Sequence, residues 1–398
     1  MKILMICGVY AEENEHEVLA HTKGYVEQSA NIFQRKLIQG LDANAIEAKI
    51  ISAPFIGAYP MRYKKMCFKG FIEAQARYQY VSFSNIWGIR NFSRSFSLKK
   101  AIKAYLSAEP EEEFLIFVYC AHTPFLDAAV YAKNLKPKSK IVFVVPDLPQ
   151  YMNLNETGRG LYDFFKRYDI RRMERYIAKV DSFVLLTEPM KDVLKVENRP
   201  YVVVEGLVDN VDGAENTRKN DDITRIVYAG KMNVKFGIKT LVDAFTSLPN
   251  EDYRLILCGD GDAREYVEEK RRTDSRIEYQ GVVSSSQVKT YINAADVLVN
   301  PRPNNEAYTK YSFPSKNIEY LMSGKPVVAY MLDGMPPCYH DFLFAVSDET
   351  VQAMRDAIEQ AIRAEDHEKK NKARMAREYM CRELLCDKVV AKIIEMNV

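Results

Sequence analysis

The chain has 398 residues, of which 47% are hydrophobic and 28% are charged, and this composition excludes intrinsic disorder as its main state. A formal net charge of +2 excludes a dedicated nucleic-acid-binding protein, while the length predicts two domains rather than one. The seven cysteines are scattered and form no Cys-x-x-Cys pair, which fits a reducing compartment, so we expect a cytoplasmic protein.

The first half of the chain alternates between short apolar runs and helical patterns. Lys2–Cys7 predicts a first strand rather than a signal peptide, and no run approaches the roughly 18 apolar residues that would span a membrane. The polar segment Val9–Lys23 predicts a long loop, and apolar spacing predicts a helix over Tyr25–Leu41. Further elements are predicted as strands at Ala48–Ser52, Leu115–Tyr119, Ile141–Val145 and Ser182–Leu186 and as a helix at Arg167–Val180.

Residues 61–103 form a basic segment with interleaved aromatic side chains. Ten lysines and arginines stand there against one acid, Glu73. The aromatic residues of the segment are Tyr63, Phe68, Phe71, Tyr78, Tyr80, Phe83, Trp87, Phe92 and Phe96. Such a surface suits anionic lipid headgroups or a polyprenyl-diphosphate-linked acceptor, so we expect peripheral contact with the inner face of a membrane. The alternative is a solvated basic face over an aromatic core.

A second set of strands and helices follows the segment Glu205–Asp222, which is polar, lacks apolar periodicity and predicts a linker. The strands are predicted at Arg225–Tyr228, Arg254–Cys258, Arg276–Gln280, Val297–Asn300 and Pro326–Tyr330. The helices are predicted at Ile238–Leu248, Asp262–Lys270, Ser286–Ala294 and Ser315–Met322, and a charged helical tail begins near Thr350. This alternation predicts an α/β fold of two doubly wound, Rossmann-like domains that face each other across a cleft, with the active site in the cleft.

Two glycine-containing turns follow strands of the second half. In Gly230–Gly237, the glycines and two lysines, Lys231 and Lys235, suit a diphosphate that also meets the positive end of the next helix. An ordinary strand-to-helix turn with solvated lysines explains the same residues equally well. Cys258–Asp262 contains only Gly-x-Gly, and a tight turn with Asp262 as the helix N-cap explains it best.

A third segment, Tyr311–Val328, combines the start of a helix with a lysine and a glutamate. Ser312 or Ser315 can cap this helix, which places Lys316 where the helix dipole already favours an anion. Glu319 lies one helical turn further on, where its carboxylate can accept hydrogen bonds from sugar hydroxyls. The plain alternative is a well-capped helix with a surface glutamate.

In order, these segments resemble the nucleotide-sugar-binding domain of GT-B glycosyltransferases. The match is nearest to glycosyltransferase family four, especially the bacterial exopolysaccharide and capsule enzymes with an FPSK-x-x-E-Y motif, here Phe313–Tyr320. The resemblance implies a hexosyltransferase that retains anomeric configuration and uses a UDP- or GDP-linked sugar as co-substrate. It implies no metal and no other cofactor, because basic residues and helix termini stabilise the leaving diphosphate. The implied domains are an acceptor-side domain at 1–205, a nucleotide-sugar domain at 206–380, and a helix at 381–398 that crosses back to the first domain.

Site residues carry over by position in the second half. Glu319 resembles the second glutamate of the family's Glu-x7-Glu motif, which binds the nucleotide ribose, and Lys231 occupies the place of a diphosphate-binding arginine. Tyr311 stands where the first glutamate of that motif would fall. Phe236 replaces a second diphosphate-binding lysine, for which Lys235 can substitute. The implied donor-binding set is Gly230, Lys231, Lys235, Tyr311, Ser315, Lys316 and Glu319.

The first half shows the same mixture of likeness and departure. The segment Val144–Pro149 resembles one that carries an active-site histidine, but Pro146 stands in its place, so Asp147 is our candidate for orienting donor or acceptor hydroxyls. His122 follows a predicted strand and is the second catalytic candidate, although a lone histidine is more often structural. Gly24 is the one counterpart of the family's Gly-Gly loop.

These residues predict a retaining glycosyltransferase of polysaccharide biosynthesis, which moves a sugar from a nucleotide diphosphate to a saccharide acceptor that is lipid-linked. The departures at Tyr311, Phe236 and Pro146 leave open a non-catalytic subunit that binds a partner glycosyltransferase. A sugar-nucleotide epimerase of the same fold is a third hypothesis, but no residue pattern points to it specifically.

Overall fold

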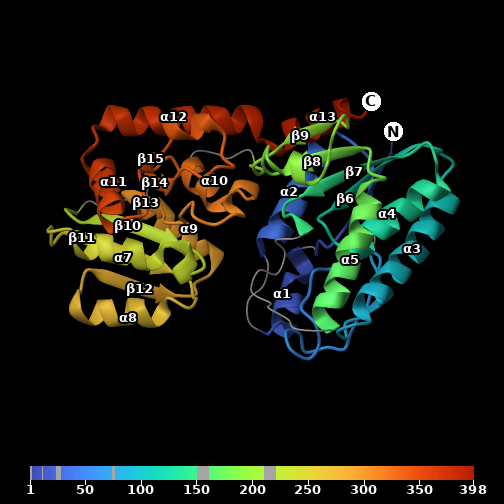
Figure 1. Ribbon diagram of the computed structural model, residues 1–398, viewed down its shortest axis with the longest axis horizontal. Coiled ribbons are helices and arrows are strands. Elements are labelled where there is room, and N and C mark those ends of the chain that lie inside the picture. The colour runs from blue at the N-terminus through green and yellow to red at the C-terminus, as the bar shows by residue number, and fades with distance from the viewer. Residues whose placement is uncertain (1, 11, 24–27, 74–76, 150–160, 210–220) are drawn as a thin grey trace. The chain divides into compact units, whose positions relative to one another are not determined.

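The computed structural model describes residues 2–10, 12–23, 28–73, 77–149, 161–209 and 221–398 (Figure 1). They form two compact units. Unit 1 comprises Met1–Asp209 and Leu385–Val398, and unit 2 comprises Asn210–Leu384. Most of the predicted linker, and Gly24, lie outside the described residues. Each unit is a parallel sheet with helices packed against it, so the predicted α/β class with two doubly wound domains is confirmed.

Unit 1 is built on a seven-stranded parallel sheet in the order β4-β2-β1-β6-β7-β8-β9. In chain order within the unit the first six are strands 3-2-1-4-5-6, the Rossmann arrangement, whose chain reverses direction across the sheet at the β1–β6 pair. The strands are β1 (Lys2–Cys7), β2 (Ala48–Ser52), β4 (Tyr78–Tyr80), β6 (Phe114–Tyr119), β7 (Lys140–Val145), β8 (Ser182–Leu185) and β9 (Tyr201–Val203). A separate antiparallel pair joins β3 (Cys67–Phe68) to β5 (Phe83–Ser84).

The central strands of unit 1 are buried on both faces, because side chains alternate along a strand and helices cover each side. Ile3, Met5 and Cys7 of β1 pack into one core with α2 and α13. The alternate residues Leu4 and Ile6 are also fully buried, and α4 contacts β1, β6 and β7. The helices of this unit are α1 (Glu12–His21), α2 (Gln28–Ala43), α3 (Arg90–Ala108), α4 (Thr123–Leu135), α5 (Leu161–Ile177), α6 (Met190–Val193) and α13 (Cys386–Glu395).

Unit 2 repeats the same plan with six parallel strands in the order β12-β11-β10-β13-β14-β15. Within the unit this is again 3-2-1-4-5-6, and the reversal falls between β10 and β13. The strands are β10 (Thr224–Ala229), β11 (Tyr253–Cys258), β12 (Ile277–Gly281), β13 (Val297–Asn300), β14 (Val327–Tyr330) and β15 (Phe344–Val346). The helices are α7 (Ile238–Thr246), α8 (Arg264–Thr273), α9 (Ser285–Ala294), α10 (Ser315–Met322), α11 (Val351–Arg363) and α12 (Asp366–Glu383).

One predicted loop is wrong. The polar segment Val9–Lys23 contains helix α1, whose buried apolar residue Val18 has no periodic partners to reveal the helix in the sequence. The predicted helix at Arg167–Val180 is α5, which begins earlier, at Leu161. In the described part of the chain, no helix combines the length and the apolar character that a membrane span needs.

Helix α13, at the end of the chain, packs against α2 within unit 1. Gly40 makes this approach possible, since a Cβ there would lie 2.2 Å from the backbone oxygen of Cys386. The Asn44 side-chain amide donates to the backbone oxygens of Gly40 and Asp387, both at 2.8 Å, which joins the two helices. The end of the chain is therefore part of the unit 1 core.

We expect Gly40→Ala to lower the melting temperature. Its gain in helix propensity is about 1 kcal/mol. The clash is with a backbone atom that cannot rotate away, and overpacking costs about 1–3 kcal/mol. Gln39→Ala, at the exposed neighbouring position, is the control and should change stability little. A Gly40→Ala variant at least as stable as wild type would contradict the packing described.

Candidate functional site

The loops that follow β10 and β13 meet at the reversal point of the unit 2 sheet, where doubly wound folds bind ligands. After β10 the chain runs through Gly230 and a 3₁₀ turn at Val234–Phe236 into α7, as predicted. After β13 it continues through Pro301 and Arg302 towards α10. The candidate site of unit 2 is built on these two connections and on the loop after β11.

The loop after β11 (the β11 loop) packs against the loop after β10 (the β10 loop). Gly259 has φ +133°, and a Cβ there would lie 1.8 Å from the backbone oxygen of Gly230, so the two backbones touch. The Gly230 amide donates to the Cys258 oxygen at 2.8 Å. The Asp262 carboxylate accepts from the Val234 amide at 2.7 Å. The predicted role of Asp262 as a helix N-cap is wrong, because α8 begins two residues later and the carboxylate ties the loops together instead.

Lys316 lies across the backbone of Gly230. A Cβ on Gly230 would fall 2.3 Å from Cε of Lys316 and 2.7 Å from the hydroxyl oxygen of Tyr228, so a larger residue would displace the end of the lysine from its place. Lys316 is the second residue of α10, where the helix dipole is positive. The structure therefore brings Gly230 and Lys316, which are far apart in the sequence, into direct contact.

The surroundings of Lys316 disfavour the charged form of its side chain. Burial lowers the pKa of its ammonium, and the nearby charge of Lys231 lowers it further, while Glu319 acts in the opposite direction. Within the described residues, the Lys316 ammonium makes no hydrogen bond or ion pair. Two cations thus lie close together with one carboxylate, Glu319, in range, an arrangement that an incoming anion would stabilise.

Helix α10 presents Ser315 and Glu319 to solvent, one turn apart. Its N-cap residue is Pro314, with no side-chain cap, so the predicted capping by Ser312 or Ser315 is wrong. The Ser312 hydroxyl instead accepts from the Arg302 guanidinium at 2.7 Å.

No side chain caps the first turn of α10: its Asn317 amide donates to the Pro314 oxygen at 2.9 Å, and the Ser315 and Lys316 amides are left to a ligand. Buried Asn317 fixes the helix start to the end of β13, since its side-chain oxygen accepts from Asn300 at 2.6 Å.

Two predicted donor-site residues, Lys235 and Tyr311, have their described contacts away from Gly230. The Lys235 ammonium lies 5.4 Å from the ring centre of Phe236, and the Arg302 guanidinium lies 5.8 Å from the same ring. Tyr311 is half-buried in a 3₁₀ turn, with the Lys310 ammonium 4.9 Å from its ring centre. The side chains that approach Gly230 are those of Lys316 and Tyr228, and the charges of Lys231 and Glu319 act on the Lys316 ammonium there.

Sequence reasoning missed two tyrosines that hold the β10 loop. The hydroxyl of buried Tyr320 accepts from the Ala229 amide at 2.9 Å, and the Tyr228 hydroxyl donates to the Lys231 oxygen at 2.8 Å. Burial raises the pKa of both phenols, so they stay neutral donors. Tyr320 follows Glu319 directly, and its place on the inner side of an amphipathic helix is the signal that could have identified it.

In unit 1, His122 and Asp147 follow the neighbouring strands β6 and β7, so they share the carboxyl edge of that sheet. Asp147 is exposed, and its charge helps to raise the pKa of the Cys120 thiol, although burial is the main cause.

His122 packs edge-on against Phe55 and Phe125. Burial, followed by the charges of Arg94 and Arg90, lowers its pKa well below the usual range, so its ring is neutral near pH 7. Its buried Nδ1 has no hydrogen-bond partner among the described residues.

Arg94 is a buried cation that sequence reasoning did not single out as a site residue. Only 2% of it is exposed, and burial lowers its pKa to about 9. Its guanidinium donates to the Pro54 oxygen at 2.8 Å and lies 4.4 Å from the ring centre of Phe83. The described contacts give Arg94 a structural role beneath the loop after β2, from which its charge acts on His122.

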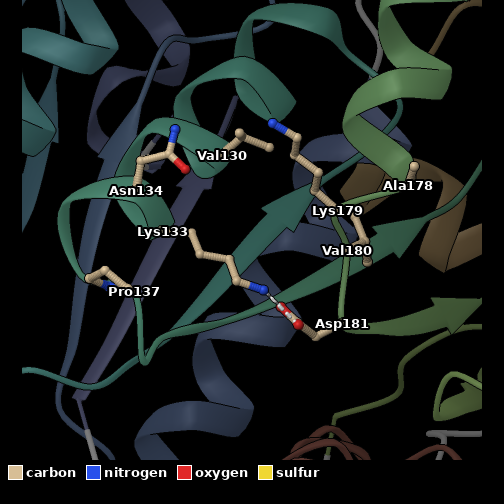
Figure 2. A pocket seen from close by; sticks show the side chains of 8 residues that line it. All are labelled: Val130, Lys133, Asn134, Pro137, Ala178, Lys179, Val180 and Asp181. Atoms are coloured by element: carbon tan, nitrogen blue, oxygen red, sulfur yellow. Dashed lines mark hydrogen bonds and ion pairs between the residues drawn. The ribbon is translucent and has the colours of Figure 1, made fainter.

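Unit 1 also has a cavity of about 510 Å³ beside the end of α4 and the start of β8 (Figure 2). Lys133 and Asp181 point toward each other there, with 2.6 Å between ammonium and carboxylate, and Asp181 also accepts from the Ile141 amide at 2.6 Å. These groups satisfy one another and join α4 to the sheet. Because the cavity lies at the amino ends of the strands, it is separate from the edge with His122 and Asp147.

The chain matches known glycosyltransferases in part of its sequence and throughout its fold. Residues 223–364 match the family Glycosyl transferases group 1. No curated protein matches the chain in sequence.

Solved structures with the same fold include a sucrose-phosphate synthase from Thermosynechococcus elongatus, with 15% identity and a TM-score of 0.64 over 100% of this chain and 98% of that one. A glycosyltransferase from Rickettsia africae has 15% identity and a TM-score of 0.65 over 99% and 97% of the two chains. HepE of Anabaena, in complex with UDP, has 13% identity and a TM-score of 0.60 over 100% and 99%. These likenesses confirm the GT-B fold that the sequence motifs indicated.

Removing the Lys231 charge should raise the pKa of Lys316. Lys231→Met leaves the burial of Lys316 unchanged but removes the neighbouring cation, so the ammonium should hold its proton to higher pH. The measurement is a pH titration of the lysine ¹³Cε resonances in ¹³C-lysine-labelled protein. Lys235→Met is the matched control and should leave the Lys316 titration where it is. A Lys316 titration that stays in place in the Lys231 variant would show that the two ammoniums are not neighbours.

Proposed function

We propose that this chain, which has the GT-B fold and a Glycosyl transferases group 1 match over residues 223–364, is a retaining glycosyltransferase that moves a sugar from a nucleotide diphosphate to a saccharide acceptor. The observation that carries the proposal is Lys316, held across Gly230 beside Lys231 at the start of α10. A diphosphate bound there would meet two ammoniums and uncapped helix amides.

In this mechanism the rate depends mainly on how well the negative charge of the leaving diphosphate is stabilised. As the bond from sugar to diphosphate breaks, negative charge grows on the leaving oxygen, and Lys231 and Lys316 stabilise it without rearrangement. Lys235, in the turn before α7, and the Ser315 amide, at the start of α10, add donors to the diphosphate. Glu319, one turn along α10, accepts hydrogen bonds from the ribose hydroxyls. The proposed chemistry needs no metal ion, because lysines and helix dipole supply the positive charge.

The sugar and the acceptor are assigned to the remaining candidates. Tyr311 takes the donor-sugar position that a glutamate has in related motifs. His122, neutral and with an unpartnered ring nitrogen among the described residues, and Asp147 orient sugar hydroxyls at the carboxyl edge of unit 1. UDP is the first donor nucleotide to test, since HepE was solved with UDP and with UDP and glucose. We assign a lipid-linked acceptor at the inner face of a membrane, where segment 61–103 would place the enzyme in polysaccharide biosynthesis.

A non-catalytic subunit that stabilises a partner glycosyltransferase is the second candidate. It is favoured by Phe236, whose ring lies close to Lys235 and Arg302 where a second phosphate-binding lysine was expected, and by Tyr311 and Pro146. It predicts no nucleotide-sugar binding and a stable complex with another protein.

A thermal-shift panel of UDP, GDP, ADP and their common sugar conjugates separates the two candidates. A ligand at 100 times its dissociation constant should stabilise the wild type by about 2.7 kcal/mol. Glu319→Ala should lose most of this shift, because the ribose loses its acceptor. Glu269→Ala, at an exposed position on α8, should keep it. No shift with any nucleotide would sink the transferase and favour the non-catalytic subunit.

Lys316→Met should slow turnover more than it weakens binding, since the ammonium acts most strongly on charge that develops in the transition state. The expected loss in kcat is about 10²–10³-fold, the range seen when one such group is removed. The assay is release of the nucleotide diphosphate from the donor that the thermal-shift panel selects, with Lys239→Met of α7 as the control for loss of an exposed lysine. A loss of donor affinity with unchanged kcat would contradict this prediction, because it would show that Lys316 contributes to ground-state binding alone.

A further inference from the structure

The aromatic residues of segment 61–103 differ in exposure: three are buried, three are strongly exposed, and Phe68, Phe71 and Tyr78 lie between these extremes. Tyr63, Tyr80 and Phe83 are buried, in agreement with an aromatic core. Trp87, Phe92 and Phe96 are exposed by 64%, 66% and 73% of their surface. The three strongly exposed rings lie within ten residues of chain around the start of α3. The predicted membrane surface and the predicted aromatic core therefore each describe only part of this segment.

Trp87 lies just before helix α3, and the helix presents Phe92 and Phe96 on one face. Ile89, Phe92 and Phe96 are spaced by three and four residues, and the same spacing continues to Lys100 and Lys103, which are exposed. The solvent-facing side of α3 is therefore apolar in its first half and basic in its second half. We call Trp87, Ile89, Phe92, Phe96, Lys100 and Lys103 the α3 face.

The opposite side of α3 is fixed, so the helix cannot turn to bury these rings. Leu98 and Ile102 are fully buried. Ser95 and Lys99 both bind Asp127 of α4, with 2.7 Å between the Lys99 ammonium and the carboxylate. Figure 1 shows α3 and α4 running side by side in unit 1.

The charges within the α3 face, those of Lys100 and Lys103, are of one sign. Glu73 is the one acid in segment 61–103, against ten bases. Lys99 and Arg94 are engaged inside the unit, whereas Lys100 and Lys103 make no hydrogen bond or ion pair with any described residue. Because protein interfaces are depleted in lysine and favour paired charges, aromatic rings beside unpaired lysines fit an anionic lipid surface better than a protein partner.

We propose that the α3 face docks unit 1 on a bilayer of anionic phospholipids. Trp87, Phe92 and Phe96 enter the interfacial layer of the bilayer, where amphipathic rings are stabilised, and Lys100 and Lys103 contact the headgroup phosphates. The proposal deepens the proposed function, because it narrows the membrane contact of segment 61–103 to six side chains and to anionic phospholipids. It rests on the proposed function in one respect only: the lipid-linked acceptor is the reason for the chain to be at a membrane.

The chain carries its own probe for this contact, because Trp87 is the one tryptophan in the sequence. On titration with vesicles of equal parts phosphatidylglycerol and phosphatidylcholine, the emission of Trp87 should move to shorter wavelength as the ring leaves water. Vesicles of phosphatidylcholine alone should bind at least tenfold more weakly. Unchanged emission at saturating lipid would overturn the proposal.

Paired variants test the two halves of the face. Phe92→Ser/Phe96→Ser should weaken vesicle binding by more than about tenfold through lost apolar burial. Lys100→Glu/Lys103→Glu should remove the preference for phosphatidylglycerol. The controls are Val282→Ser, an equally exposed apolar position in unit 2, and Lys289→Glu/Lys370→Glu, two exposed lysines of unit 2. All changed side chains are exposed, so melting temperatures should match the wild type.

Two other outcomes would also overturn the proposal. A concentration-dependent Trp87 shift without lipid, with a dimer in sedimentation, would assign the face to a second copy of the chain. Wild-type vesicle binding in both α3 variants would place the lipid contact elsewhere. Vesicle binding needs no nucleotide, so Glu319→Ala should bind vesicles like wild type, and failure of the proposed function stays distinguishable from failure of this contact.

Discussion

The contact of Lys316 with Gly230 is the constraint on which the unit 2 site depends. An ammonium brought into a partly buried place loses hydration, and a second cation nearby adds to the cost. That cost is sustained because the lysine is anchored by its backbone in α10, and α10 is tied to β13 through Asn317 and Asn300. On the other side, Gly230 is held against the β11 loop by Gly259. The position of the charge is thus set by two strands and a helix rather than by the lysine itself.

The sheet order explains why these parts meet. In a doubly wound sheet, the connections on either side of the reversal leave in opposite directions, and their loops border a space at the carboxyl edge. In unit 2 these are the loops after β10 and β13, which carry Gly230 and lead to α10. In unit 1 the corresponding edge holds Gly8 after β1 and His122 after β6. The same topology therefore places candidate groups at equivalent edges of two sheets that differ in sequence.

The sequence predicted most of the fold because the central strands are apolar on both faces, as in β6, where every residue is buried. Among the described strands of the two parallel sheets, those that it did not predict, β4, β9 and β15, are each three residues long and lie at sheet edges, and the two-residue strands β3 and β5 were not predicted either. Short edge strands carry little periodic signal, since half of their pairing is missing and few side chains are buried. In the site, the positions of Lys316 and Glu319 on a helix could be predicted from spacing. Contacts between distant segments could not: Asp262 has the chemistry of an N-cap, and only the fold shows that it binds the neighbouring loop instead.

Two departures from the family motif, Phe236 and Tyr311, fall in the proposed donor site, and a third, Pro146, lies in unit 1. Phe236 and Tyr311 replace charged residues, and the structure surrounds their rings with Lys235, Arg302 and Lys310. Positive charge therefore remains around both positions, although the lysine and the glutamate expected there are absent. At the Gly230 contact nothing comparable is lost, because Lys231, Lys316 and Glu319 are all present and within electrostatic range of one another. A chain that only stabilised a partner would have no reason to hold a partly buried lysine beside a second cation. The presence of that costly arrangement therefore favours the proposed transferase over the proposed subunit without activity.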